Sequence, residues 1–179
     1  QLSRTGWHTS GIPKNLGESI AEHSWGTSFF ALRISLEMKR SHESLDFEKV
    51  LAMAIIHDLG ESITSDIPRS AILRSKVLTD DAKAEAEREA MEIILADENH
   101  VHDYLLELHL EMQHRSTLEA RIVRAADLLD MMNHAVWLER IGVNSKIVQP
   151  FIETSFQSIK EMGISGATRL AEKITRLRE

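Results

Sequence analysis

Residues 46–61 read DFEKVLAMAIIHDLGE, a strongly apolar run that ends in polar residues able to bind a metal ion. Asp46 suits a helix N-cap, and the pattern predicts a helix from there to about Gly60. Residues 52–56 alone would also suit a strand, but the helical pattern extends beyond them on both sides. One face of this helix should carry Val50, Ala54, His57, Asp58 and Glu61.

Helical periodicity continues through the chain, and convincing alternating strands are hard to find. Residues 2–17 are expected to form an ordered loop or short turns. Further helices are expected over 18–40, 79–96, 102–112, 116–140, 150–162 and 165–178, with a capping box at 116–119 and Pro150 opening its helix. Without repeats or a long linker, we expect one all-α domain over residues 1–179.

Composition limits the function. The 179 residues carry a formal net charge of -7, which argues against DNA or RNA as a partner. With no cysteine, a metal ion must be held by nitrogen and oxygen ligands, and nine histidines are present. No apolar stretch approaches the roughly 20 residues that cross a bilayer, and the start shows no signal-peptide pattern. We therefore expect a cytoplasmic protein without a membrane partner.

Polar residues interrupt three otherwise apolar helix faces. His23 lies among inward-facing residues of 18–40, His57-Asp58 follows the run MAII, and Asp127 interrupts IVRAADLLDMM. Alone, His23 could be a core histidine, and Asp127 could pair with a neighbouring arginine. Two buried carboxylates, however, need a compensating cation or strong hydrogen-bond donors. Together the four residues indicate a site for one divalent ion.

The order of these residues resembles the HD superfamily of metal-dependent phosphohydrolases, an all-α helical bundle. More specific strings resemble its 5'-deoxynucleotidase branch, the YfbR-like and HDDC2-like proteins. They are RTGW at 4–7, ESIAEHS at 18–24, HDLGE at 57–61, SDIP at 65–68 and ARIVRAAD at 120–127. The resemblance spans about residues 4–135 and leaves the helices over 150–178 unmatched. It implies removal of phosphate from deoxynucleoside 5'-monophosphates, a transition-metal dication and a homodimer.

The resemblance also implies roles for individual residues. The implied metal ligands are His23, His57, Asp58 and Asp127. Glu61 and Asp66 match the acids placed around the attacking water and the leaving oxygen. Arg4 matches an arginine that binds phosphate, and Trp7 an aromatic residue that lies against the sugar. Ser65 stands where the branch usually has glycine, so the backbone near Asp66 is expected to differ.

An independent argument supports this chemistry. A divalent ion held by nitrogen and oxygen ligands polarises phosphoryl oxygens and lowers the pKa of water. Glu61 lies one helical turn beyond His57, so it can hold or deprotonate the water. An arginine such as Arg4 offers a planar fork suited to phosphate. The residue types do not select among Co, Mn, Zn, Ni and Fe.

Other residues leave alternatives open. Asp130 and His134 share a helix face with Asp127, where they either support the site or are ordinary polar residues. His100, His102, His109 and His114 are expected on the solvated surface, as is one face of residues 83–95. If some of these histidines bound a second metal, the chain would be a phosphodiesterase or a nucleotide-polyphosphate hydrolase. A non-catalytic nucleotide-binding domain is the third alternative.

Residues 136–138 (VWL) predict apolar contacts in a homodimer.

Overall fold

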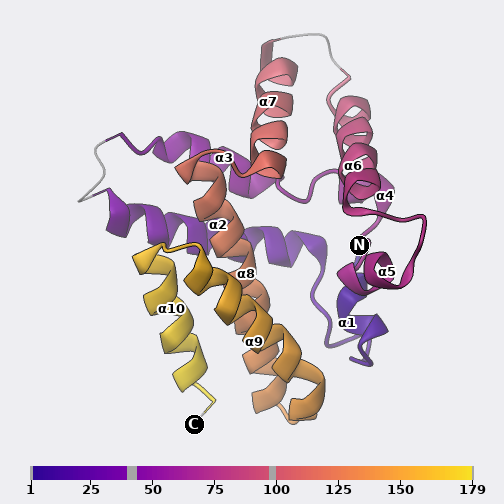
Figure 1. Cartoon of the computed structure of the whole chain (residues 1–179), viewed down its shortest axis with the longest axis vertical. Helices are drawn as coiled ribbons and strands as arrows, with labels where there is room; N and C mark the ends of the chain where they lie inside the picture. The colour runs from indigo at the N-terminus through magenta and orange to yellow at the C-terminus, as the bar shows by residue number, and fades with distance from the viewer. Residues whose placement is uncertain (1, 40–43, 97–99, 179) are drawn as a thin grey trace.

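Helix α8 (Leu118–Arg140) runs through the middle of the helical bundle (Figure 1). It packs most extensively against α2 (Ile20–Met38) and α9 (Ser145–Glu161). Helix α3 (Phe47–Ile56) packs against α2 and α8, and α10 (Ser165–Arg176) packs against α8 and α9. Neighbours on several sides explain why α8 is buried around most of its circumference.

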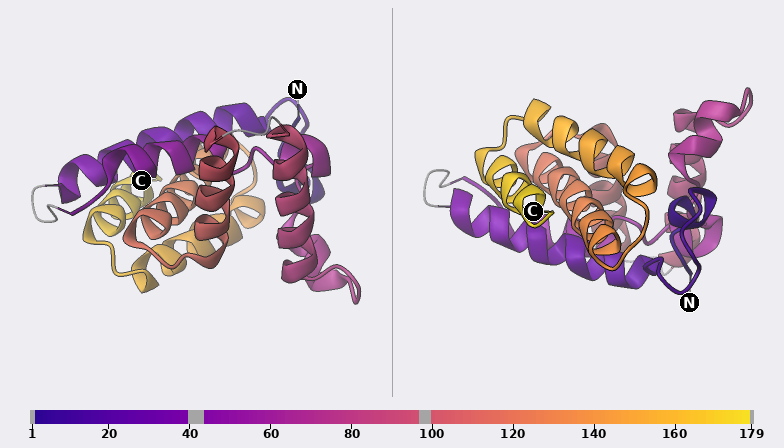
Figure 2. Two further views of the ribbon diagram at one scale, coloured as in Figure 1. Left: turned by 90° about the horizontal axis from the view of Figure 1, so that it is seen from above. Right: turned by 90° about the horizontal axis from the view of Figure 1, so that it is seen from below.

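A second group of helices lies at one end of this bundle (Figure 2). Helix α6 (Asp80–Ile94) packs against the short α4 (Glu61–Thr64) and against α7 (His100–His114), and α7 packs on α3 and α8. The short helices α1 (Thr5–Thr9) and α5 (Arg69–Arg74) lie in the same region (Figure 1). This group faces the point where α3 ends, which places the residues after α3 between the two groups.

The structure is a computed structural model, and it describes residues 2–39, 44–96 and 100–178. Within these ranges the chain is helical apart from turns, loops and one isolated bridge between Ser3 and Ser19, so the predicted all-α class is confirmed. The core contains fully buried side chains from most of the described helices, including Ile34, Met53, Leu129, Met132 and Ile152. None of the described helices combines the length and the apolarity needed to span a bilayer.

Local signals place most helix ends. Ser19 caps α2 in a capping box, where its hydroxyl accepts from the Glu22 amide and the Glu22 carboxylate accepts from the Ser19 amide. Asp46 caps α3 as predicted, by accepting from the amide of Lys49 at 3.0 Å. These two caps matter for function because they fix the starts of the helices that carry His23 and lead to His57.

Several predicted boundaries were wrong. Thr117, not Ser116, caps α8, because its hydroxyl accepts from the Ala120 amide. Helix α9 begins at Ser145, where Asn144 supplies the cap, so Pro150 lies inside the helix. The segment expected as loop or turns includes the short α1, and residues 69–74 form α5. Helix α2 ends at Met38, and the predicted end at Arg40 lies outside the described residues.

Candidate metal centre

His23 lies in the first turn of α2 and is fully buried. Its two ring nitrogens face different carboxylates of α8. Nε2 lies 3.2 Å from Oδ1 of Asp127, and Nδ1 lies 2.7 Å from Oδ2 of Asp130. Since 127 and 130 are three apart on one helix, they project from the same face and bracket the imidazole.

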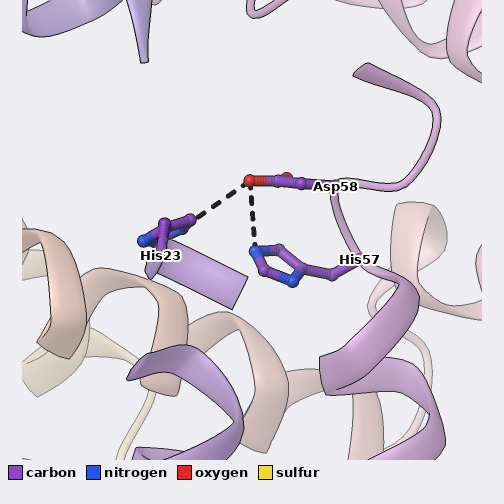
Figure 3. A group of neighbouring side chains, drawn as sticks. All are labelled: His23, His57 and Asp58. Atoms are coloured by element: carbon purple, nitrogen blue, oxygen red, sulfur yellow. Dashed lines mark ion pairs between the residues drawn. The ribbon is translucent and has the colours of Figure 1, made fainter. Parts of the chain in front are cut away.

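His57 and Asp58 follow the last residue of α3, in a turn and not in the longer helix that the sequence predicted. The Nδ1 atom of His57 lies 2.9 Å from the carbonyl oxygen of Ala54, where it can donate a hydrogen bond. That bond leaves Nε2 of His57 free to face the site. Oδ2 of Asp58 lies 3.2 Å from this Nε2 and 3.7 Å from Nε2 of His23. Figure 3 shows the Asp58 carboxylate between the two imidazole rings, with both contacts as dashed lines.

The two Nε2 atoms test whether a metal ion fits. Both are buried, and among the described residues neither makes a hydrogen bond, although each lies 3.2 Å from a carboxylate oxygen. Ring nitrogens left without a partner inside a protein cost free energy unless a ligand satisfies them. His23, His57 and Asp58 offer ligand atoms that all lie within 4.8 Å of one another. Their donor types and their unsatisfied state fit a divalent transition metal ion.

Asp127 faces the same ring nitrogen of His23, Nε2, as Asp58 does. Its second oxygen, Oδ2, is paired with Arg124, which is the alternative to metal binding that the sequence left open, while Oδ1 lies against His23. Burial opposes ionisation of the Asp127 carboxyl, but the charges of Arg124, His23 and His57 outweigh it and hold its pKa well below the usual range. The carboxylate is therefore ionised and available to a cation.

The electrostatics of the metal-free site show a shortage of positive charge. Burial and the charge of Arg4 oppose protonation of His23, yet Asp127, Asp130 and Asp58 outweigh them and raise its pKa to about 10. A histidine that must stay protonated to balance its carboxylates occupies a place where a cation would do the same.

Glu61, the first residue of α4, is buried and lines the same cavity. Its Oε1 lies 3.5 Å from Nζ of Lys83, while Oε2 is buried without a hydrogen-bond partner. Burial, together with the charges of Asp58 and Asp66, raises the pKa of Glu61 to about 8 despite Lys83. Lys83 belongs to the segment that the sequence described as a solvated helix face, and its place at the site was missed.

The predicted substrate residues line the cavity, which has a volume of about 570 Å³. Arg4 lies with its NH1 atom 3.6 Å from Oε1 of Glu18. Trp7 is only 2% exposed, and its Nε1 donates to Oε1 of Glu18 at 3.1 Å. Oδ2 of Asp66 accepts from the Gly6 amide at 3.2 Å, which ties the loop after α4 to α1. Glu18 therefore links Arg4 and Trp7, a role that the sequence did not indicate.

Ser65, just before Asp66, has φ 61° and ψ 159°. Glycine adopts this backbone region readily, whereas side-chain-bearing residues rarely do. The serine thus adopts a conformation that is typical of glycine, and the expected difference in the backbone near Asp66 stays a prediction.

His109 corrects another expectation. It lies in α7, is 3% exposed and lines the cavity, whereas the sequence placed it on the solvated surface. Burial lowers its pKa. Among the described residues, the groups of three close ligands contain His23 with His57 and Asp58, or with Glu18 and Asp130. Neither group includes His109.

Comparisons with known proteins show the family to which the chain belongs. Residues 1–158 match a family model described as an HD domain. The 5'-deoxynucleotidase hdd1 of Schizosaccharomyces pombe is 32% identical over 76% of this chain and 65% of its own length. The 5'-deoxynucleotidase HDDC2 of Dictyostelium discoideum is 28% identical over 78% of this chain and 71% of its own length.

A solved structure extends the likeness to the whole fold. A conserved hypothetical protein from Pyrococcus furiosus superimposes with a TM-score of 0.80 and 33% identity, over 98% of this chain and 92% of that one. The chain belongs to the HD-domain family, as the order of its motifs predicted. It spans slightly less than two thirds of the length of the S. pombe relative.

Proposed function

We propose that this chain is a metal-dependent phosphohydrolase that releases phosphate from nucleoside 5'-monophosphates, with a preference for the deoxy form. One observation carries the proposal: the buried Nε2 atoms of His23 and His57 have no hydrogen-bond partner beside the carboxylate of Asp58. The relatives named 5'-deoxynucleotidases support the substrate class.

A single divalent transition metal ion (Co, Mn, Zn, Ni or Fe) would be held by His23, His57, Asp58 and Asp127. When bound, such an ion supplies Lewis acidity toward phosphoryl oxygens and water. Two neutral imidazoles and two carboxylates would leave the site close to neutral overall. The family membership and the donor set both support a metal-dependent site.

Arg4 would bind the phosphate group. Its guanidinium lies near four acidic residues, and burial opposes but does not outweigh their effect in raising its pKa. The group is therefore permanently charged, and it can offer several N–H donors to the phosphoryl oxygens. Glu18 holds the guanidinium from behind, at 3.6 Å.

Glu61 would handle the proton. In the reaction, a water oxygen bonds to phosphorus, the bond from phosphorus to the 5'-oxygen breaks, and the leaving oxygen gains a proton. A carboxyl group whose pKa lies near neutrality can accept the proton of the water and return a proton to the leaving oxygen. Asp66 lines the same cavity and is the second candidate for this transfer.

Trp7 would form a rigid wall beside the sugar. The ring lines the cavity and packs at centroid distances of 5.0 Å from His134 and 4.6 Å from Phe151. A side chain held on both sides cannot move away from a 2'-hydroxyl group. We therefore expect the wall to favour a deoxyribose.

The test is phosphate release from a panel of substrates by the metal-loaded protein. We expect monophosphates such as dAMP to react much faster than dATP or a cyclic nucleotide, and dAMP faster than AMP. Equal rates on dAMP and AMP would remove the deoxy preference but not the hydrolase class. No phosphate release from any nucleotide would favour a non-catalytic nucleotide-binding domain.

We also propose a homodimer, although only one of the three residues 136–138 that predicted it is exposed. Val136 and Leu138 are buried within one chain, so neither is available to a partner. Trp137 is 45% exposed, and Trp25 and Phe29 on α2 are 73% and 47% exposed. Light scattering at micromolar concentration should give twice the chain mass, and a monomer mass would contradict this.

A further inference from the structure

Asp130 sits behind the proposed metal site, on the side of His23 away from the ligands. Its Oδ2 lies 2.7 Å from Nδ1 of His23, and both residues are buried. A carboxylate only accepts hydrogen bonds, so this contact places the proton of the imidazole on Nδ1. In the neutral imidazole that metal binding requires, the opposite nitrogen, Nε2, then keeps its lone pair and faces Asp58 and Asp127.

Gly26 makes room for this carboxylate. It lies one turn after His23 on α2, where a Cβ atom would come within 1.9 Å of Oδ1 of Asp130. That separation is far below any van der Waals contact, so a side chain at position 26 would force Asp130 to move. The glycine and the aspartate therefore form one unit, which seats the carboxylate against the α2 backbone beside His23.

The neighbouring Glu18 does not duplicate this role. Its Oε1 lies 3.9 Å from Nδ1 of His23, beyond hydrogen-bonding distance, and accepts instead from Nε1 of Trp7. Asp130 thus makes the only short carboxylate contact with Nδ1 among the residues that the structure describes.

We propose that Asp130 is a positioning residue that fixes the tautomer and ring orientation of His23 for metal binding, and that Gly26 is required to seat it. A carboxylate that accepts from the far nitrogen of a ligating histidine makes that histidine a better ligand, and its loss typically costs about 10- to 100-fold in metal affinity. The inference rests on the proposed metal site, but it can fail while that site stands.

The first experiment measures Zn²⁺ affinity of the full chain by competition with a chelator. Asp130→Asn keeps the size of the side chain, but its amide can present a donor to Nδ1 and favour the wrong tautomer. We expect affinity to fall about 10- to 100-fold with the fold retained by circular dichroism. An unchanged affinity would overturn the positioning role.

Asp58→Asn separates the two proposals. If it weakens binding while Asp130→Asn does not, the metal site stands and only the positioning role fails. If neither variant changes the affinity, the metal site itself is wrong. In the zinc-loaded native protein, NMR should show a slowly exchanging proton on Nδ1 of His23, and its loss in Asp130→Asn would report the tautomer without relying on activity.

Gly26→Ala provides an independent arm, with Gly166→Ala as the matched control. At Gly166 the nearest atom to an added Cβ is the carboxylate of Glu37 at 3.4 Å, so little should change. Gly26→Ala should weaken Zn²⁺ binding, whereas in the Asp130→Ala background it should cause no further loss. If the two substitutions lowered the Zn²⁺ affinity independently and additively, Gly26 and Asp130 would not act together as proposed. Should Gly26→Ala fail to fold, the Asp130→Asn affinity decides the question.

Discussion

Oε1 of Glu61 lies 3.5 Å from Nζ of Lys83, and the other carboxylate oxygen of Glu61 is buried without a hydrogen-bond partner. The lysine also lies 3.3 Å from Oε1 of Glu87 and from the carbonyl oxygen of Ile67, so its position is fixed by three groups. A cation held in this way lowers the pKa of Glu61, against the effects of burial and neighbouring carboxylates.

Replacing Lys83 by Met should therefore raise the pKa of Glu61 further. If Glu61 must be ionised to accept a proton, the acidic limb of the kcat/KM profile should move to higher pH. The control is Arg88→Met on the same helix, where a half-buried arginine pairs with Glu85 and Glu92 outside the cavity. A Lys83→Met profile that overlies the native one would show that Glu61 does not act as the base.

Glu61→Gln tests the same residue directly. The amide cannot accept the proton, so turnover should fall by about 10²- to 10⁴-fold. Because Glu61 is proposed to contact water and substrate and not the metal ion, metal content and nucleotide binding should stay close to native. Loss of the metal in this variant would make Glu61 a ligand, and full activity would move the proton transfer to Asp66.

The metal-free protein should become less stable as the pH rises. The pKa of His23 is raised from 6.5 to about 10, and that of Glu61 from 4.5 to about 8. Both groups bind protons more tightly in the folded chain than in the unfolded chain. Their contribution to the free energy of unfolding is therefore complete when the pH is below their pKa values in the unfolded chain. It is lost as the pH rises through their pKa values in the folded chain. Asp58 and Asp127 have lowered pKa values, so their losses occur at acid pH, outside this window.

Thermal unfolding of the chelated protein checks this prediction. Its Tm should fall between about pH 6 and pH 9, while the metal-loaded protein should change less, since the cation replaces the protons. A chelated protein whose Tm stays level or rises over this range would contradict the electrostatic description of the site.

Sequence reasoning found the residues whose polarity is out of place in their own helix. His57 and Asp58 stand out because they follow MAII, and Asp127 because it interrupts an apolar face. Lys83 and Glu18 did not stand out, because their sequence neighbourhoods are polar and their contacts depend on tertiary folding. The contact between His23 and Asp130 joins residues 107 positions apart. No local sequence pattern can predict a contact between residues so far apart in the chain.

The start of α9 and the burial of His109 were also predicted incorrectly. Pro150 suggested the first turn of a helix, but Asn144 caps the chain earlier and the helix tolerates the proline within it. His109 was expected to be solvated because its sequence neighbours are polar, yet packing of α7 on α3 and α8 buries it. A local cap decided the first case, and tertiary packing decided the second.

Ser65→Gly should stabilise the protein. A serine at φ 61° and ψ 159° carries about 1–3 kcal/mol of backbone strain, which glycine relieves. The greater freedom of glycine in the unfolded chain offsets about 0.5–1 kcal/mol of this gain. We expect a net increase of about 1 kcal/mol in the free energy of unfolding, measured in urea. Ser62→Gly, within α4, is the control and should lower the free energy of unfolding. If Ser65→Gly also lowered it, the backbone at Ser65 would not be strained.

His109→Leu distinguishes one metal ion from two. Both ring nitrogens of His109 are buried without a partner, so an apolar side chain should raise the free energy of unfolding by about 1 kcal/mol. The number of metal ions per chain should not change. His114→Leu, at an exposed position of the same helix, is the control. Loss of a metal ion from His109→Leu would instead support a dinuclear site and the phosphodiesterase alternative.

The most direct test of the account is phosphate release from dAMP while the chelated protein is titrated with Co²⁺. In the proposed site, Asp58 and Asp127 would supply the negative charge that holds a single cation. Activity should be absent after chelation and reach its plateau at one equivalent of Co²⁺ per chain, whereas Asp58→Asn should need far more. Full activity in the chelated protein, or an unchanged titration for Asp58→Asn, would contradict the proposed metal-dependent mechanism.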